Sequence, residues 1–204
     1  MKKSVYRRPN KPKTLTVTQR NGAPSRALPA LPDVLSVDRA TECHVTPADV
    51  ALRMVEALEA SRDQLTLEPS AGNGSLVNAL LESDHSPFEL VMVERSSELC
   101  GALRNRFSKF NTPDPINECF LDYAERASNS IEYPRIIMNS PFKAVKKHVE
   151  AALNLLGRAG HRDAAMVALV PVTFEHVDAE LIELLPNDTF ASAAVYTKIV
   201  RFVR

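Results

Sequence analysis

Cysteine is scarce in this chain of 204 residues, which has three: Cys43, Cys100 and Cys119. Their odd number and the lack of any CxxC pairing argue against a disulfide framework and a structural zinc site. This usage predicts a reducing, cytoplasmic environment. The five histidines are far apart and form neither an HxxxH motif nor an HxE motif paired with a CxxC, so we expect no metal.

Long apolar runs are also missing. No stretch approaches the roughly 18 apolar residues of a membrane-spanning helix, and the N-terminus lacks the apolar core of a signal peptide. We therefore expect no membrane as a partner. With 45% hydrophobic residues the chain can still bury a full core, and its length favours one domain with an appendage.

Acidic residues are absent from residues 1–32, which hold eight lysines and arginines. The rest of the chain carries 17 basic and 25 acidic residues, so a basic arm precedes an acidic body. This asymmetry favours an anionic polymer such as nucleic acid as partner; the alternative is a solubilising tail that binds nothing specific. Because residues 1–36 are rich in Pro, Lys, Arg, Thr and Ser, we expect a mostly disordered arm with extended pieces, followed by one domain at 37–204.

Apolar periodicity alternates between strand and helix through this domain. Thr46-Pro47 is typical of an N-cap followed by a first-turn proline. The pattern predicts an α/β fold with a Rossmann-like, doubly wound, mostly parallel sheet of seven strands and helices on both faces. We expect helices at 47–60, 76–82, 97–107 and 144–156, strands at 65–67, 88–93, 116–121, 136–138 and 165–170, a short helix or turn at 177–185, and a closing strand pair at 191–196 and 199–203.

A glycine-rich turn, LEPSAGNGSL at 67–76, joins the first of these strands to a helix. Its glycines can adopt backbone angles closed to other residues, and the helix behind presents N–H groups to a ligand. No Lys-Ser/Thr follows Gly74, which argues against a nucleotide phosphate loop. Val77 stands where a dinucleotide fingerprint has its third glycine, which weakens that alternative as well.

Acidic residues follow three of the predicted strands. Glu68 precedes the turn, and Glu94 lies 20 residues beyond Gly74, the usual spacing for a carboxylate that accepts from ribose hydroxyls. Two such carboxylates suit a ligand with a ribose and a cationic amino-acid portion. Asp122, at the expected end of the third strand, can accept from the amine of an adenine ring. The alternatives are an ordinary strand-end acid at Glu68, a solvated helix start at Glu94 and an N-cap at Asp122.

A second polar turn ends the strand at 136–138, in the sequence IIMNSPF. The side-chain carbonyl of Asn139 and the main-chain carbonyl of Ser140, held by Pro141, can converge on one amino group. Phe142 offers a flat face on which a planar base can stack. A plain Asn-Ser-Pro turn is the alternative.

In order, the segments LEPSAGNGS, VMVE, FLDY and IIMNSPF resemble class I S-adenosylmethionine-dependent methyltransferases, above all the N6-adenine DNA methyltransferase group. The resemblance covers about residues 42–204 and begins with a Thr-Pro-led helix. It implies that Asn139, Ser140, Pro141 and Phe142 form the catalytic tetrapeptide, in which Asn139 and Ser140 hold the target amine. The residues that it implies for binding S-adenosylmethionine are Thr46, Glu68, Ser70, Ala71, Gly72, Gly74, Glu94, Arg95, Asp122 and Asn139.

Two features depart from this family. Ser140 replaces the first proline of the tetrapeptide Asp/Asn-Pro-Pro-Tyr/Phe, which keeps the main-chain acceptor but lowers local rigidity. We also expect no large target-recognition domain after Phe142. Basic residues follow the tetrapeptide directly and are candidates for phosphate contacts, with a solvated helix face as the alternative. They are Lys143, Lys146, Lys147 and His148.

The sequence thus predicts methyl transfer to the N6 amine of adenine, in DNA first and in RNA second. Small enzymes of this kind suggest a role in protecting DNA from restriction. Two alternatives stay open: a methyltransferase that acts on RNA or on a protein glutamine, and a nucleic-acid-binding protein in which Ser140 marks lost activity.

Overall fold

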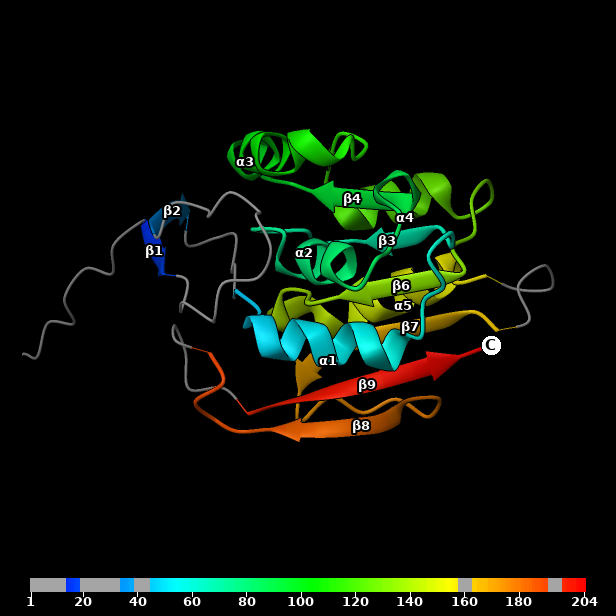
Figure 1. The fold of residues 1–204 in the computed structure, drawn as a ribbon. Coiled ribbons are helices and arrows are strands. Elements are labelled where there is room, and N and C mark those ends of the chain that lie inside the picture. The colour runs from blue at the N-terminus through cyan, green and yellow to red at the C-terminus, as the bar shows by residue number, and fades with distance from the viewer. Residues whose placement is uncertain (1–13, 19–33, 39–44, 158–162, 191–195) are drawn as a thin grey trace, which may run out of the picture.

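The computed structural model describes residues 14–18, 34–38, 45–157, 163–190 and 196–204 (Figure 1). Its main sheet has seven strands in the order β5-β4-β3-β6-β7-β9-β8. β9 is antiparallel to both of its neighbours, and the other pairs in this sheet are parallel. This confirms the predicted fold class. In sheet order the strands are β5 (Ile116–Asn117), β4 (Leu90–Glu94), β3 (Thr66–Glu68), β6 (Arg135–Met138), β7 (Ala165–Pro171), β9 (Thr197–Val203) and β8 (Glu180–Leu185).

Helices cover both faces of this sheet. Strand side chains alternate between two buried clusters, so that Ile137 faces one layer while Ile136 and Met138 face the other. The first layer contains α1 (Ala48–Leu58), α2 (Ser75–Glu82) and α3 (Ser97–Phe107). The second contains α4 (Phe120–Ala127) and α5 (Val145–Leu155). Short 3-10 turns lie at Pro87–Glu89, Ser108–Phe110 and Phe142–Ala144.

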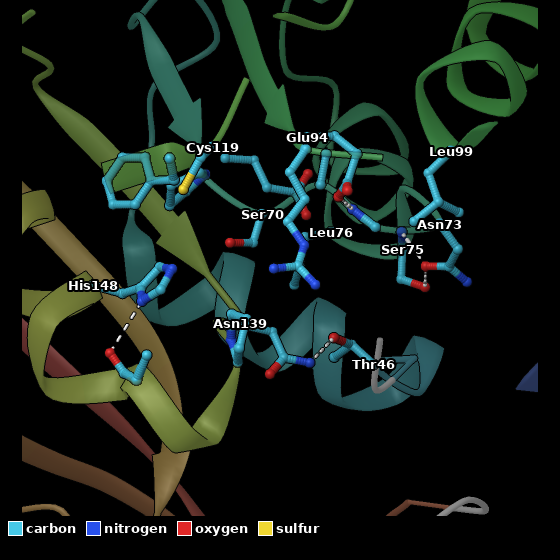
Figure 2. A pocket seen from close by; sticks show the side chains of 18 of the residues that line it. Thr46, Ser70, Asn73, Ser75, Leu76, Glu94, Leu99, Cys119, Asn139 and His148 are labelled. Atoms are coloured by element: carbon cyan, nitrogen blue, oxygen red, sulfur yellow. Dashed lines mark hydrogen bonds between the residues drawn. The ribbon is translucent and has the colours of Figure 1, made fainter. Parts of the chain in front are cut away.

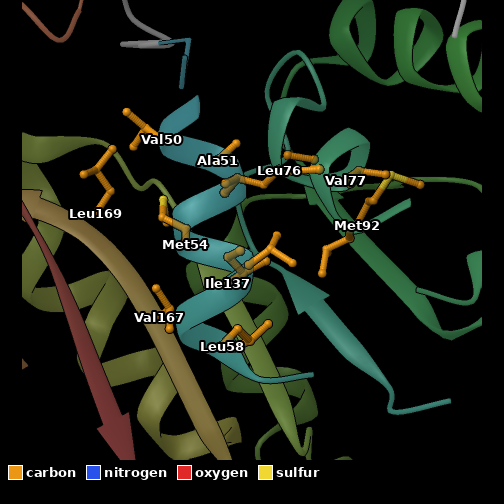
Figure 3. Close-up of a cluster of buried hydrophobic side chains, with 14 of the residues drawn as sticks. Val50, Ala51, Met54, Leu58, Leu76, Val77, Met92, Ile137, Val167 and Leu169 are labelled. Carbon is orange, nitrogen blue, oxygen red and sulfur yellow. The ribbon is translucent and has the colours of Figure 1, made fainter. Parts of the chain in front are cut away.

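Helix α1 is held by one apolar stripe, as its periodicity predicts. Ala51, Met54, Val55 and Leu58 are buried against α2 and the sheet (Figure 3). Full burial of side chains such as Met54 and Leu58 stabilises the fold by about 1.5–3 kcal/mol each. The stripe therefore sets the position of the residues just before the helix, including Thr46.

The predicted cap of α1 is wrong. The helix begins at Ala48 with Pro47 in the cap position and without a side-chain cap bond among the described residues. The hydroxyl of Thr46 instead accepts a hydrogen bond from Asn139. The hydroxyl of Thr46 is thus bonded to the strand end after β6 rather than to the first turn of α1.

The third strand is shorter than predicted. β5 ends at Asn117, and Phe120 begins helix α4. The buried residues of α4 have helical spacing: Phe120, Tyr123, Ala124 and Ala127. The apolar run Cys119-Phe120-Leu121 before them resembles a strand, which is why the sequence argument extended the strand too far. Asp122 therefore lies in the first turn of a helix with its side chain exposed, and its predicted place at a strand end is wrong.

The closing strand pair also differs from the prediction. Residues 180–185, expected as a short helix or turn, form strand β8, which pairs with β9 through an irregularity between Leu181 and Glu183. β8 lies at the edge of the sheet with mostly exposed side chains, so no clean alternation marked it in the sequence. Most of the strand expected at 191–196 lies outside the described residues.

Two short strands fall within or across the expected arm. β1 (Thr14–Thr18) pairs antiparallel with β2 (Val34–Asp38) in a separate two-stranded sheet. β2 crosses the expected boundary at residue 36, and most of the arm lies outside the described residues. Among the helices that the structure describes, none has the length and apolar character needed to cross a membrane.

Candidate functional site

A cavity of about 410 Å³ opens where the strands β3, β4, β5 and β6 end (Figure 2). This size lies in the range of small-molecule sites. The parallel strands bring their carboxyl ends to one edge of the sheet, so residues far apart in sequence meet there. The residues expected at the site that line the cavity are Thr46, Glu68, Ser70, Ala71, Gly72, Glu94, Arg95, Asn139, Pro141 and Lys143.

The glycine-rich turn is tied to the neighbouring strand by its main chain. The N–H of Ala71 donates to the carbonyl oxygen of Val93 at 3.0 Å, and the N–H of Gly72 donates to Oε2 of Glu94 at 2.9 Å. Gly72 and Gly74 have φ angles of 54° and 79°, in the left-handed region that favours glycine. The turn therefore has one defined shape before any ligand arrives.

Gly74 itself does not line the cavity that the described residues form. It caps α2, and a Cβ atom at this position would lie 2.6 Å from the ring of Phe107 in α3. Gly74 thus allows the glycine-rich turn to pack closely against α3. This packing supports the turn on the side away from the cavity.

Glu94 is built into the turn rather than solvated at a helix start. Its side chain is 7% exposed, and both carboxylate oxygens accept from main-chain N–H groups: Oε2 from Gly72, Oε1 from Ser96 at 2.8 Å. These bonds fix the carboxylate at the wall of the cavity, where its remaining lone pairs can accept from hydroxyl groups of a ligand.

Glu68 lies deeper and is 3% exposed. Its Oε2 has no hydrogen-bond partner among the described residues. Burial, followed by repulsion from Glu94, raises the pKa of Glu68 well above its usual value. A cationic group in the cavity would supply the missing partner and favour the charged carboxylate.

Asn139 and Thr46 meet across the cavity, 93 positions apart in sequence. The amide nitrogen Nδ2 of Asn139 donates to Oγ1 of Thr46 at 3.0 Å (Figure 2). Because the nitrogen is engaged there, the amide has one orientation, with its carbonyl oxygen Oδ1 turned away from Thr46. The side chain of Asn139 therefore offers an acceptor of defined direction.

The side chains of Ser140 and Phe142 lie outside the cavity lining formed by the described residues, whereas Pro141 belongs to that lining. Ser140 is 2% exposed, and its Oγ has no hydrogen-bond partner among the described residues. Phe142 packs at the edge of the first core layer, with its ring 6.0 Å from that of Phe190 in an edge-to-face arrangement. Neither belongs to the cavity lining, and the stacking role of Phe142 stays a prediction.

One end of the cavity contains residues that the sequence argument did not assign to it. Cys119, Phe120 and Leu121 line this end in place of the exposed Asp122. His148 joins them from α5, with its ring stacked on Phe120 at a centroid distance of 5.8 Å. The helical period of α4 could have revealed Phe120, whereas no local pattern marked His148.

The basic residues after the tetrapeptide separate into two groups. Lys143, Lys146 and Lys147 are exposed, and Lys143 also lines the cavity. His148 is buried, and burial lowers its pKa, with a smaller effect from Arg95. A buried imidazole with a lowered pKa is less suited than the exposed lysines to contact a phosphate, and the phosphate contacts of this region stay a prediction.

Comparison with family models found no match, and no curated protein is similar in sequence. Solved structures do match. The 23S rRNA methyltransferase ErmE aligns with a TM-score of 0.60 and 18% identity over 76% of this chain and 67% of that one. A type I restriction-modification system methyltransferase subunit from Streptococcus thermophilus aligns with a TM-score of 0.63 and 17% identity over 78% of this chain. TrmN from Thermus thermophilus aligns with a TM-score of 0.58 and 14% identity over 77% of this chain.

This chain spans 44% of the Streptococcus thermophilus subunit and 48% of TrmN. The matches show that the chain has the Rossmann-like fold of these methyltransferases.

Proposed function

We propose that this chain is an S-adenosylmethionine-dependent methyltransferase that modifies the N6 amine of adenine in a nucleic acid, with DNA as the first candidate. The observation that carries the proposal is the bond between Asn139 and Thr46 in the cavity that also contains the glycine-rich turn. This bond supports the proposal because it orients a hydrogen-bond acceptor for an amine beside a turn that suits a nucleoside with an amino-acid portion.

The residues at the turn fit the cofactor. The buried Glu68, with an oxygen that lacks a partner among the described residues, suits the cationic amino-acid end. Glu94, fixed by Gly72 and Ser96, suits the ribose hydroxyls. When bound, S-adenosylmethionine supplies a methyl group on a positively charged sulfur, which is already activated for transfer.

The protein must then hold the target amine, which receives the methyl group. Oδ1 of Asn139 and the main-chain carbonyl of Ser140 accept the two N–H bonds of the target amine, which directs its nitrogen lone pair toward the methyl donor. Alignment of this kind lowers the barrier without a general base, and the amine proton leaves late to solvent. Ser140 keeps the carbonyl that this role needs.

Nucleic acid is the acceptor that the charges favour. The exposed Lys143 lies at the cavity, Lys146 and Lys147 follow it on α5, and eight basic residues precede the body without an acid. RNA is the second candidate, because the similar ErmE is a 23S rRNA methyltransferase. With DNA as acceptor, protection from restriction is the role that we favour.

A transfer assay tests the proposal. Tritiated S-adenosylmethionine is offered with unmethylated DNA, with RNA and with protein extract, and the modified base is identified after digestion. We expect label in N6-methyladenine of DNA. Asn139→Ala should reduce the rate by about 100-fold or more, the scale of a lost transition-state contact. The matched variant Ser140→Ala keeps the main-chain carbonyl and should stay within a few-fold of the wild type.

Each other outcome has a defined meaning. Label in RNA or in protein glutamine moves the proposal to that acceptor. Equal labelling by the wild type and Asn139→Ala contradicts the assigned site. Calorimetric binding of S-adenosylmethionine without transfer to any acceptor would favour a binding protein that keeps the fold.

A further inference from the structure

We propose that His148 recognises the exocyclic amine of the cofactor's adenine ring, with Nε2 as the hydrogen-bond acceptor. This inference rests on the proposed function and assigns to His148 the part that the sequence argument gave to Asp122.

The order of the strands locates the base. The glycine-rich turn follows β3, Glu94 ends β4, and Cys119 follows β5, and these three strands are neighbours in the sheet. A ligand with its amino-acid end at the turn and its ribose at Glu94 extends its base toward the end of β5. Cys119, Phe120 and Leu121 line the cavity there.

His148 reaches this end from another part of the chain. It lies on α5, after β6, and α5 packs against α4. The contact brings the imidazole onto the ring of Phe120, with an angle of 28° between the ring planes. His148 and Cys119 lie on the same side of the view in Figure 2.

The chemistry at this end favours His148 as the acceptor. Phe120 and Leu121 carry no polar side-chain atom, and the thiol of Cys119 is a weak acceptor. Asp122 is exposed on the first turn of α4 and is absent from the lining formed by the described residues. An imidazole nitrogen with a lone pair is therefore the strongest side-chain acceptor described at the base end.

The hydrogen bond of His148 defines which nitrogen has that lone pair. Nδ1 lies 3.0 Å from the carbonyl oxygen of Ala144, which can only accept, so the proton is on Nδ1. In the neutral ring Nε2 then carries the lone pair, and no hydrogen bond to Nε2 is found within the described part of the chain. Burial lowers the pKa of His148, which keeps this neutral form dominant at pH 7.

The arrangement predicts a preference for a ligand that donates at this position. An adenine amine donates to Nε2, whereas a purine with hydrogen in place of the amine gives Nε2 no donor. A lost hydrogen bond of this type costs about a factor of ten in affinity.

The test is a calorimetric double-mutant cycle. The wild type, His148→Phe and His148→Gln are titrated with S-adenosylhomocysteine and with its analogue that carries purine in place of adenine. We expect the wild type to prefer the adenine ligand by about tenfold and His148→Phe, which keeps a ring against Phe120, to show a preference below about twofold. His148→Gln retains an acceptor and should restore part of the preference.

A second arm separates the two sources of an adenine amine. Single-stranded DNA with adenine or purine at one position is titrated in the presence of saturating S-adenosylhomocysteine. The inference expects the same base preference in the wild type and in His148→Phe.

The outcomes distinguish this inference from the proposed function. Failure of the wild type to bind S-adenosylhomocysteine contradicts the proposed function itself. Binding with an equal adenine preference in all three proteins, or a His148 effect confined to the DNA base, overturns only the role of His148. If His148→Phe does not fold, as judged by circular dichroism, either of two results overturns the role of His148. One is no adenine preference in the wild type, and the other is a preference in the folded His148→Gln equal to that of the wild type.

Discussion

The hydrogen bond between Thr46 and Asn139 orients the side chain that we propose as acceptor for the target amine. We expect Thr46→Val, which keeps the shape and removes the hydroxyl, to lower kcat by about tenfold, because the amide of Asn139 then loses its fixed orientation. Affinity for S-adenosylhomocysteine should change by less than about threefold. Methyl-transfer kinetics and calorimetry measure the two quantities separately.

The matched control for this position is Thr46→Ser, which keeps the hydroxyl. It should retain most of the rate. An equal loss in Thr46→Ser and Thr46→Val would show that the methyl group of Thr46, rather than its hydroxyl, matters.

Glu68 is a second residue whose environment makes a prediction. Its raised pKa means that the folded protein holds this proton above pH 4.5, where the unfolded chain has lost it. The stability contribution is therefore complete below pH 4.5 and is lost as the pH rises through the folded pKa. Without ligand, Glu68→Gln should gain stability relative to the wild type between pH 4.5 and pH 8, by about 2–4 °C in Tm or more. Thermal denaturation at both pH values measures it, and a Tm difference independent of pH would contradict the buried carboxylate.

Among the helices, the close packing of the start of α2 against α3 depends on Gly74. A Cβ atom there would meet the ring of Phe107 at 2.6 Å and the side chain of Leu103 at 2.8 Å, and φ is 79°. Strain and overpacking together predict that Gly74→Ala lowers the free energy of unfolding by about 2–4 kcal/mol. Urea denaturation gives this value directly.

Gly101, in the middle of α3, is the control for this substitution. An added Cβ atom there finds no described atom within 4 Å. Gly101→Ala should therefore raise the free energy of unfolding by about 0.5–1 kcal/mol, the difference in helix propensity. Similar effects of the two substitutions would show that the packing at Gly74 is not tight.

In the whole molecule the net charge is zero, but a basic N-terminal segment precedes an acidic body. Each phosphate contact contributes about 0.9 to the slope of log affinity against log salt concentration for duplex DNA. Combined replacement of Lys143, Lys146 and Lys147 by Gln should lower that slope by about 2–3. Lys109→Gln, an exposed position after the far end of α3, should leave it unchanged. Fluorescence anisotropy at several salt concentrations measures the slopes, and equal slopes for both variants would contradict the lysine contacts.

The main elements could be predicted because their apolar periods are long and regular. Helix α3 has the bounds that its pattern predicts, and α1, β6 and β7 lie within one or two residues of theirs. β5 and β8 could not be predicted in the same way. Two residues of β5 are too few to show a period, and β8 is an edge strand whose exposed side chains carry no alternation.

The candidate site could be predicted in part for a related reason. Glu68 and Glu94 end parallel strands and Asn139 follows one, and that topology gathers strand ends at one edge. The bond between Thr46 and Asn139 joins positions 93 apart, and the stack of His148 on Phe120 joins two helices. Neither contact can be recognised from a local sequence pattern.

The fold class, the glycine-rich turn and the polar ends of the strands could be inferred from the sequence, because apolar periodicity and backbone freedom are local properties. Which of these polar groups share a cavity, and in which direction their pKa values shift there, depends on the tertiary structure. Burial raises the pKa of Glu68 and lowers that of His148, and it depends on helix layers built from distant segments. The packing of α4 against α5 is also what exposes Asp122 and brings His148 to the cavity.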